Sequence, residues 1–346
     1  MKNKNAWLLS DLKNIKKNNI KVMSTFSCGG GSTMGYKLAG CEVISANDID
    51  RKMKDHYLKN FQVKHYFENP IKELIDMDLP EELYGIDILD GSPPCSTFSM
   101  IGNREKDWGK EKYFREGQSK QVLNDLFFDY IDLVDKIKPK VSISENVKGM
   151  LMGNAKGYTK MIMERFREIG YEPQLFLING IDCGVPQSRQ RVFFCCIRKD
   201  LFKKKLELNP NETLVTVRQA CSDIQELTEE EKDYAFKLPE STKKHYKFIK
   251  PGRSYADIGN PNNGFSKFRL NKNKPSPTIC ASAKGSILHW EECREITTRE
   301  YIRLGSFPDD YKFQTNAYAV YLIGMSVPPK MMYQVADAVC KQWLSI

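Results

Sequence analysis

Between residues 21 and 200, short apolar runs alternate with segments of helical periodicity, and this alternation constrains the fold more than any other feature of the sequence. The apolar runs predict strands at 21–27, 41–48, 86–92, 140–147, 172–180 and 191–198. The periodic segments predict helices at 32–39, 50–61, 124–137 and 158–170. Because parallel neighbouring strands need a crossover between them, this repetition favours a doubly wound, mostly parallel α/β sheet.

The alternation stops after the last of these strands, and residues 201–268 are polar, basic and poorly periodic. Periodic order then returns and ends in a helix that begins at Pro328 and Pro329, since proline suits the first turn of a helix. The apolar face of this helix comprises Met332, Val335, Ala336 and Val339. We therefore predict a large domain at 1–200, a smaller inserted region at 201–268, and a segment at 269–346 that returns to the large domain.

The apolar content of the chain argues against a membrane protein. No apolar run approaches the roughly 18 residues that a membrane-spanning helix needs. The amino-terminal stretch lacks the apolar core and cleavage site of a signal peptide. We expect it to form an amphipathic helix whose apolar face comprises Trp7, Leu8, Leu12 and Ile15. A cytoplasmic protein without membrane contact is the expectation.

The cysteine pattern argues against a metal site. The chain has ten cysteines and four histidines, but no pair with the CxxC spacing and no cluster of the two residue types. Structural zinc sites need such spacings. In a chain without an export signal, most of these thiols should be reduced. We therefore expect no bound metal.

A glycine cluster, Gly29–Gly31, separates the first predicted strand from its helix. Glycines at this point let a ligand approach the backbone and the start of the helix, although a plain tight turn would look the same. Asp48 ends the next strand, 22 residues after Phe26, where open α/β folds place an acid against ribose hydroxyls. Together these features predict an adenosine-bearing cofactor, either NAD or S-adenosylmethionine.

The segment Pro93-Pro94-Cys95 directly follows the third predicted strand. Two prolines fix the backbone and remove two amide donors, so the strand must end before them. Cys95 is thus held at the carboxyl edge of the sheet, where α/β folds bind their ligands. A buried, inert thiol is the alternative. Because a fixed thiol serves covalent catalysis and is of no use in hydride transfer, Cys95 favours S-adenosylmethionine over NAD.

Charged residues lie at the end of the predicted strand 140–147 and at the start of the predicted strand 191–198. Glu145 lies at the carboxyl end of the 140–147 strand, where it could donate a proton or pair with a nearby lysine or arginine. Arg189 and Arg191 alternate with Gln190, so an extended backbone would point both arginines to one side. Arginines placed in this way can hold a phosphate or a carbonyl oxygen.

Basic residues gather between residues 237 and 274, in a chain whose formal net charge is +9. Ten lysines and arginines stand there against two acids, Glu240 and Asp257, with aromatic residues between them. A solvated loop is one interpretation, and a surface that follows phosphates and stacks on bases is the other. The candidate nucleic-acid contacts are Lys243, Lys244, Lys247, Arg253 and Lys267.

Taken in order, the glycine cluster, PPCSTFS (93–99), ENV (145–147), QSRQR (187–191) and GMSVPP (324–329) resemble the cytosine-C5 DNA methyltransferase family of bacteria and phages. The resemblance covers about residues 22–200 and 275–340. It implies a Rossmann-like S-adenosylmethionine-dependent methyltransferase, with 201–268 in the position of a smaller target-recognition domain. Duplex DNA is the implied partner, a cognate restriction endonuclease is left open, and the implied state is a monomer.

The resemblance also implies a mechanism in which S-adenosylmethionine methylates carbon 5 of a cytosine flipped out of the duplex, leaving S-adenosylhomocysteine. Cys95 matches the nucleophile that adds to carbon 6, Glu145 the carboxylate at ring nitrogen 3, and Arg191 the arginine near the carbonyl oxygen. Ser96 and Arg189 match positions near the DNA, and Arg189 would also hold nearby backbone. The implied cofactor site comprises Phe26, Gly30, Gly31, Asp48, Ile49, Pro94, Leu126, Met325 and Ser326.

Several positions depart from the family pattern. Pro70 stands where an acid often contacts adenine, Met325 replaces an asparagine, and Ser96 replaces a glutamine. None of these changes removes a catalytic group, so we expect an active enzyme. Two alternatives stay open within the fold: a transfer RNA methyltransferase and a DNA-binding relative that has lost catalysis. A thiol-bearing NAD enzyme is the third.

Overall fold

The computed structural model describes residues 3, 5–94, 111–112, 121–122, 126–153, 155–258, 267–283 and 285–345. The chain forms two compact units, each built from separate stretches of sequence. The sheet unit comprises Asn14–Asn179, Gln190–Pro210 and Met332–Ile346. The mixed unit comprises Met1–Lys13, Gly180–Arg189 and Asn211–Met331.

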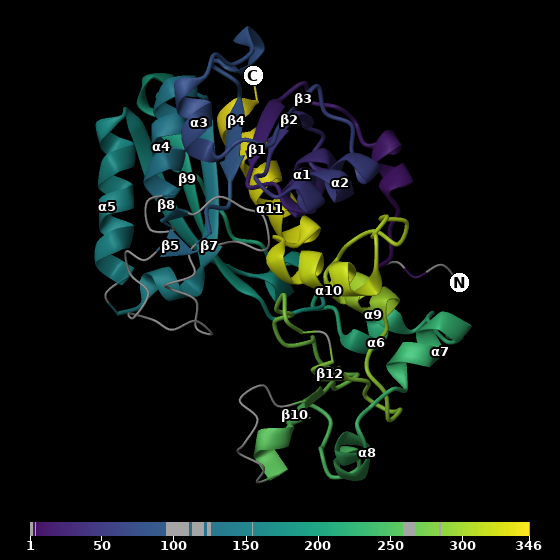
Figure 1. Cartoon of the computed structure of the whole chain (residues 1–346). Helices are drawn as coiled ribbons and strands as arrows, with labels where there is room; N and C mark the ends of the chain where they lie inside the picture. The colour runs from purple at the N-terminus through teal and green to yellow at the C-terminus, as the bar shows by residue number, and fades with distance from the viewer. Residues whose placement is uncertain are drawn as a thin grey trace. The chain divides into compact units, whose positions relative to one another are not determined.

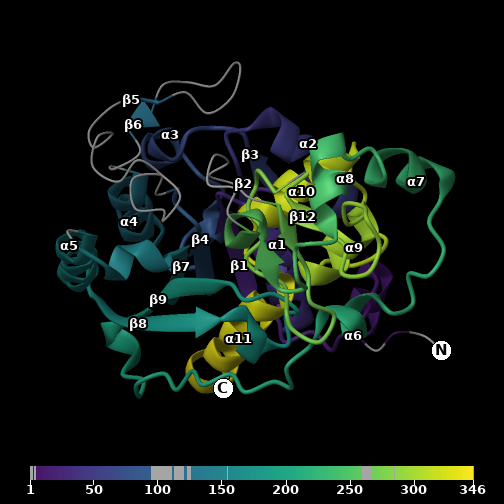
Figure 2. The same ribbon diagram turned by 90° about the horizontal axis from the view of Figure 1, so that it is seen from below.

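A seven-stranded sheet in the order β3-β2-β1-β4-β7-β9-β8 organises the sheet unit (Figure 1). Its strands are β1 (Lys21–Thr25), β2 (Glu42–Asn47), β3 (His65–Phe67), β4 (Ile88–Gly91), β7 (Val141–Val147), β8 (Tyr171–Asn179) and β9 (Gln190–Arg198). Strand β9 pairs with β7 on one side and with β8 on the other, and it is antiparallel to both. Strand β8 therefore forms one edge of the sheet (Figure 2). The other strand pairs are parallel. The predicted doubly wound, mostly parallel α/β sheet is confirmed.

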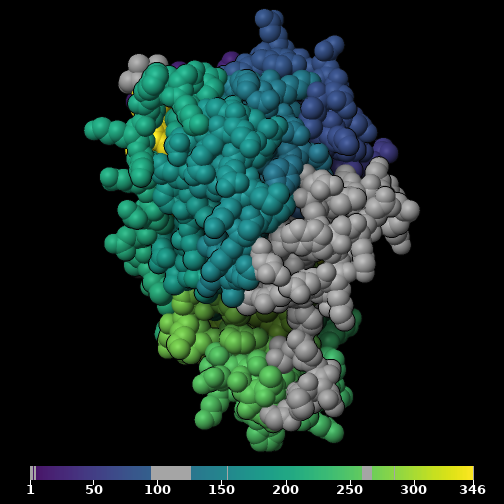
Figure 3. Space-filling view, turned by 90° about the vertical axis from the view of Figure 1, so that its left-hand side faces the viewer, coloured from purple at the N-terminus to yellow at the C-terminus, as the bar shows by residue number. Residues whose placement is uncertain are grey.

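Helices cover both faces of this sheet. They are α1 (Gly31–Leu38), α2 (Arg51–Asn60), α3 (Ile71–Asp76), α4 (Leu126–Ile137), α5 (Ala155–Glu168) and α11 (Pro329–Val339). On one face, Leu74 of α3, Ile131 of α4 and Ile162 of α5 share an apolar cluster with Met23 and Leu89 of the strands. The outer surface of α5 and its neighbours is the teal region of Figure 3.

On the other face, α1 packs closely against α11. A Cβ atom on Gly35 would lie 2.5 Å from the Cβ atom of Met332, so only glycine permits this approach. The residues predicted to form the apolar face of the last helix, Met332, Val335, Ala336 and Val339, are all fully buried. That prediction is confirmed, and α11 packs beside α1 on this face of the sheet.

Two local features differ from the predictions. The amino-terminal segment forms a short 3-10 helix, Leu9–Asn14, and not a longer amphipathic helix. The short strand β3 and helix α3 were not predicted, because three half-buried residues and a six-residue helix carry little periodicity. The strand before Cys95 ends at Gly91, as the two following prolines require.

The mixed unit combines short helices with a small sheet. Its helices are α6 (Val217–Cys221), α7 (Glu229–Ala235), α8 (Glu240–Tyr246), α9 (Thr298–Leu304) and α10 (Asn316–Met325). Its sheet is β10 (Arg253–Ser254), β11 (Phe268–Arg269) and β12 (Ile287–Leu288). In the sheet unit, a separate two-stranded pair joins β5 (Glu111–Lys112) to β6 (Gln121–Val122). Asn3 bonds to the carbonyls of Gln219 and Ala220, which ties the chain's start to α6.

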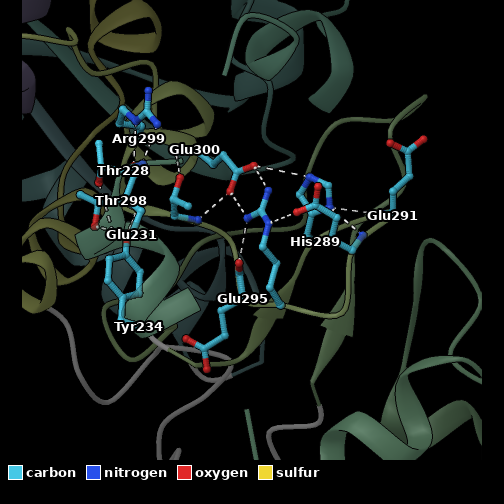
Figure 4. A network of polar contacts seen from close by, with 12 residues as sticks. Thr228, Glu231, Tyr234, His289, Glu291, Glu295, Thr298, Arg299 and Glu300 are labelled. Carbon is cyan, nitrogen blue, oxygen red and sulfur yellow. Dashed lines mark hydrogen bonds and ion pairs between the residues drawn. The ribbon is translucent and has the colours of Figure 1, made fainter. Parts of the chain in front are cut away.

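A buried ionic network holds the loop that follows β12 to α9 (Figure 4). Arg294, 2% exposed, donates two hydrogen bonds of 2.9 and 3.0 Å to the carboxylate of Glu300, which is 1% exposed. His289 lies 3.6 Å from the same carboxylate and accepts backbone N–H bonds of Glu291 and Glu292 at Nδ1. Burial, with Arg294 nearby, lowers the pKa of His289 to about 3, so this imidazole is neutral.

Among the described residues, no helix is long and apolar enough to cross a lipid bilayer. Within the same ranges, no group of His, Cys, Asp and Glu side chains is arranged to hold a metal ion. The nine described cysteines are all free thiols.

Candidate active site

The loop between β1 and α1 has an unusual backbone. Phe26, Cys28 and Gly30 all adopt positive φ angles, of 51°, 46° and 77°. Residues other than glycine rarely adopt positive φ angles, so the surrounding structure must hold the loop in this conformation. A Cβ atom on Gly30 would also lie 2.4 Å from the ring of Phe61, which requires glycine there.

Asp48 at the end of β2 holds that loop in place. Its carboxylate accepts a hydrogen bond of 2.8 Å from the Cys28 backbone N–H and one of 2.9 Å from that of Asp50. Burial raises the pKa of Asp48 to about 6. The structure therefore brings together the glycine loop and the acid that the sequence assigned to one cofactor site.

The remaining predicted cofactor residues lie in both units. Within the sheet unit, Ile49 and Pro94 are half-buried, and Leu126 is buried at the start of α4. In the mixed unit, Met325 at the end of α10 is 45% exposed and Ser326 is buried. The positive-φ loop, held tightly against the Phe61 ring, and the adjacent Asp48 carboxylate fit an adenosine-bearing group.

Two predicted catalytic residues are in direct contact. Glu145 of β7 is 8% exposed, and its carboxylate lies 2.8 Å from Nε of Arg191 on the neighbouring strand β9. The β7–β9 register pairs Val147 with Arg191 and so sets the two side chains on one face. The sequence left open whether Glu145 donates a proton or pairs with a nearby lysine or arginine, and the structure shows the ion pair. The two predicted catalytic residues therefore lie at the same place.

A hydrogen bond connects this strand end to the proline segment. The side-chain amide of Asn146 donates to the backbone carbonyl of Pro93 at 3.1 Å, and the contact is buried. Cys95 and Ser96 lie outside the described residues. The last described residue before them, Pro94, is adjacent to the carbonyl that Asn146 holds, so the chain enters the Cys95 segment from beside the Glu145 strand.

Arg189 does not match its predicted contact with DNA. It belongs to the mixed unit, is 2% exposed, and donates hydrogen bonds of 2.9 Å to the carbonyls of Ile279 and Gly324. A phosphate contact needs an accessible guanidinium. We correct this assignment: Arg189 holds backbone, as the resemblance also implied, and β9 begins only at the next residue.

Some of the predicted DNA contacts in the mixed unit pair with a carboxylate of the protein, and others are exposed. Lys243 pairs with Glu240 at 2.7 Å, and the Lys267 ammonium lies 3.7 Å from Glu295. Arg253 lies 3.9 Å from Asp257 and is exposed. Lys244 and Lys247 are exposed at the end of α8, and Lys247 lies over the ring of the exposed Phe248.

A family model described as C-5 cytosine-specific DNA methylase matches residues 20–341 of this chain. The chain belongs to this family. It is 32% identical to the Type II methyltransferase M.NgoFVII of Neisseria gonorrhoeae, over 94% of this chain and 88% of that protein. It is 28% identical to M.NgoPII of the same organism, over 94% and 96%.

A solved structure has the same fold. It is a putative DNA modification methyltransferase encoded within an E. coli prophage, with a TM-score of 0.73 and 20% identity. The alignment covers 94% of this chain and all of that one. Family membership makes this protein a cytosine-C5 DNA methyltransferase that takes its methyl group from S-adenosylmethionine. The predicted family and enzyme class are confirmed, and the NAD alternative is excluded.

Two features of this methyltransferase were missed in the sequence. The first is Asp90, which the sequence showed only as the acidic end of an apolar run and which is 1% exposed on β4. A carboxylate inside a buried strand was the available signal. The second is the pairing of Arg294 with Glu300, six residues apart, in a segment so rich in charged residues that the sequence did not mark this pair as the buried one.

Proposed function

We propose that the enzyme methylates carbon 5 of a cytosine flipped out of duplex DNA, through a covalent bond between Cys95 and carbon 6 of the ring. The observation that carries this proposal is the contact of Glu145 with Arg191 at the strand end where Asn146 holds the Pro93 carbonyl. An acid, a guanidinium and the entry to the Cys95 segment thus lie together on the carboxyl edge of the sheet, the usual ligand-binding edge of such folds.

Each residue has a chemical role in this proposal. The Cys95 thiolate adds to carbon 6, because carbon 5 of cytosine is too weak a nucleophile without that addition. Glu145 donates a proton or hydrogen bond to ring nitrogen 3, and Arg191 stabilises the charge that develops near the carbonyl oxygen. To do so, the 2.8 Å ion pair between them must open to admit the ring. Water removes the carbon-5 proton, and the thiolate then leaves.

The cofactor site would comprise the loop Phe26–Gly31, with Asp48 and Ile49 on the ribose side and Pro94 and Leu126 beside it. When bound, S-adenosylmethionine supplies the sulfonium methyl group and leaves as S-adenosylhomocysteine. The Asp48 carboxylate already accepts two backbone N–H bonds, so it is fixed before a ribose arrives. We assign Met325 and Ser326 to the same site from their position in the family motif.

DNA would be held by the exposed cations of α8 and its surroundings. Lys244 and Lys247 are the strongest candidates because they are exposed, and Phe248 beside them is 58% exposed and able to stack. Lys243, Arg253 and Lys267 would exchange a carboxylate partner for a phosphate. Ser96 is assigned to the DNA from the family motif alone. The Type II names of the relatives support a role in restriction and modification, beside a cognate endonuclease.

The test is transfer of labelled methyl groups from S-adenosylmethionine to duplex DNA and, separately, to transfer RNA. We expect label in DNA, its loss in Cys95→Ser, and its retention in the control Cys293→Ser, which removes a half-buried thiol of the mixed unit. Label only in transfer RNA would move the enzyme to that substrate. No label in either nucleic acid, with DNA binding retained, would instead indicate a binding protein without catalysis.

A further inference from the structure

Asp90 lies on the same face of the sheet as Glu145. The β4–β7 register pairs Asp90 with Ile143, and Glu145 follows two residues later on the same side of β7. The carboxylate of Asp90 accepts a hydrogen bond of 2.8 Å from the Ser24 hydroxyl and one of 3.1 Å from the Tyr36 hydroxyl. Two carboxyl groups therefore project from neighbouring strands, one buried inside the sheet unit and one at the strand end.

The charges on this face do not balance if both carboxyl groups are ionised. Arg191 pairs with Glu145 at 2.8 Å and offsets one negative charge. The titratable groups that act on Asp90 are Tyr36 of α1, Tyr57 of α2, Tyr130 of α4 and Glu145 of β7. None of these four can carry a positive charge. Burial raises the pKa of Asp90 to about 7, and the negative charge of Glu145 contributes.

We propose that Asp90 is a positioning residue that shares one proton with Glu145 and keeps that proton available for ring nitrogen 3 of the cytosine. In the free enzyme the proton resides on Asp90, and Glu145 is the anion paired with Arg191. When the ring engages Arg191, the proton moves to Glu145. Asp90 then becomes the anion, stabilised by the hydroxyls of Ser24 and Tyr36. The two carboxyl groups together hold one proton before and after the exchange, and no other reactant is needed.

This role rests on the proposed function of Glu145, and it predicts a pH profile. In Asp90→Asn the buried carboxyl group that holds the shared proton is absent, so the pair no longer keeps that proton to high pH. The descending alkaline limb of kcat/KM for duplex DNA should therefore move to lower pH by roughly one unit. At low pH, where the supply of protons limits neither protein, the rates should agree within about threefold.

Tyr130→Phe is the matched control, because its hydroxyl bonds to the Leu89 and Ile143 carbonyls of the same two strands but not to the Asp90 carboxylate. Its profile should keep the wild-type shape. If Asp90→Asn lowers the rate by the same factor at every pH, Asp90 is merely structural and the inference is wrong. Should that variant not fold, Tyr36→Phe replaces it: the Asp90 anion loses a hydrogen-bond donor and the pair keeps its proton to higher pH. The alkaline limb should then move to higher pH, and an unshifted limb overturns the inference.

A second measurement does not depend on activity. A buried carboxyl group that keeps its proton to about pH 7 stabilises the fold below pH 4 and loses that contribution as the pH rises to 7. Between pH 5 and pH 8, the melting temperature of the wild type should therefore fall by several degrees relative to that of Asp90→Asn. A constant difference overturns the shared proton. A wild type without Cys95-dependent methylation overturns the proposed function instead.

Discussion

At the scale of single residues, the site depends on a few groups in unusual surroundings. Glu145 is 8% exposed and in contact with a guanidinium, so its replacement can be tested without disturbing a large core. Glu145→Gln keeps the shape of the side chain but removes the acid. We expect kcat to fall by roughly 10²- to 10⁴-fold, as for the loss of a general acid, with binding of S-adenosylmethionine retained in calorimetry. Glu172→Gln, exposed on β8, is the control and should keep the wild-type rate. An unchanged rate in Glu145→Gln would remove Glu145 from the chemistry.

Gly30 is the residue on which the cofactor loop depends. Gly30→Ala would place a Cβ atom 2.4 Å from the Phe61 ring, on a backbone with φ of 77°. We expect a loss of about 1–3 kcal/mol in the free energy of unfolding and at least roughly tenfold weaker binding of S-adenosylmethionine. Gly157→Ala is the control: it lies in α5 with nothing within 4 Å, and should stabilise by up to about 1 kcal/mol. If the two variants bind S-adenosylmethionine with equal affinity, this loop does not take part in cofactor binding.

At the scale of elements, periodicity predicted the long strands and helices because burial on one face repeats over many residues. The helix α4 and the strand β7 lie within the segments predicted for them. The short β3 could not be found in this way, because its three half-buried residues are held at the sheet edge by pairing with β2. Local spacing also could not show that Arg189 would bond to Ile279 and Gly324, since those contacts join distant parts of the chain.

The loop after β12 is held to α9 by the buried ion pair of Arg294 with Glu300. We expect the stability of the protein to depend strongly on this pair. Arg294→Ala would leave the carboxylate of Glu300, 1% exposed, without its bidentate partner. We expect a loss of about 3–5 kcal/mol in the free energy of unfolding, measured with denaturant, because an uncompensated charge is then buried. Lys272→Ala, which breaks a surface pair with Glu291, should change stability by less than about 1 kcal/mol. Similar losses in the two variants would show that the buried network adds little.

At the scale of the whole molecule, the site residues come from segments that the sequence separates widely. Glu145 and Arg191 lie 46 positions apart and meet because β7 and β9 are neighbours. The order of motifs was enough to predict the family, and hence the roles. It did not predict Asp90, whose significance depends on three strands and a helix packed around it. Such an arrangement is a property of the assembled sheet and has no local pattern.

The net charge of +9 makes the interaction with DNA a property of the whole molecule as well. Each lysine that neutralises a phosphate releases counterions, so affinity falls with salt in proportion to the number of such contacts. The double variant Lys244→Ala/Lys247→Ala should therefore reduce the slope of log K against log salt by about 2 and weaken binding to every duplex sequence alike. Lys341→Ala, which removes a cation paired with Asp337, is the control and should keep the wild-type slope. Fluorescence anisotropy between 50 and 300 mM salt measures both. A wild-type slope in the double variant would place the phosphate contacts elsewhere, and weakening confined to one duplex sequence would indicate that these lysines read bases.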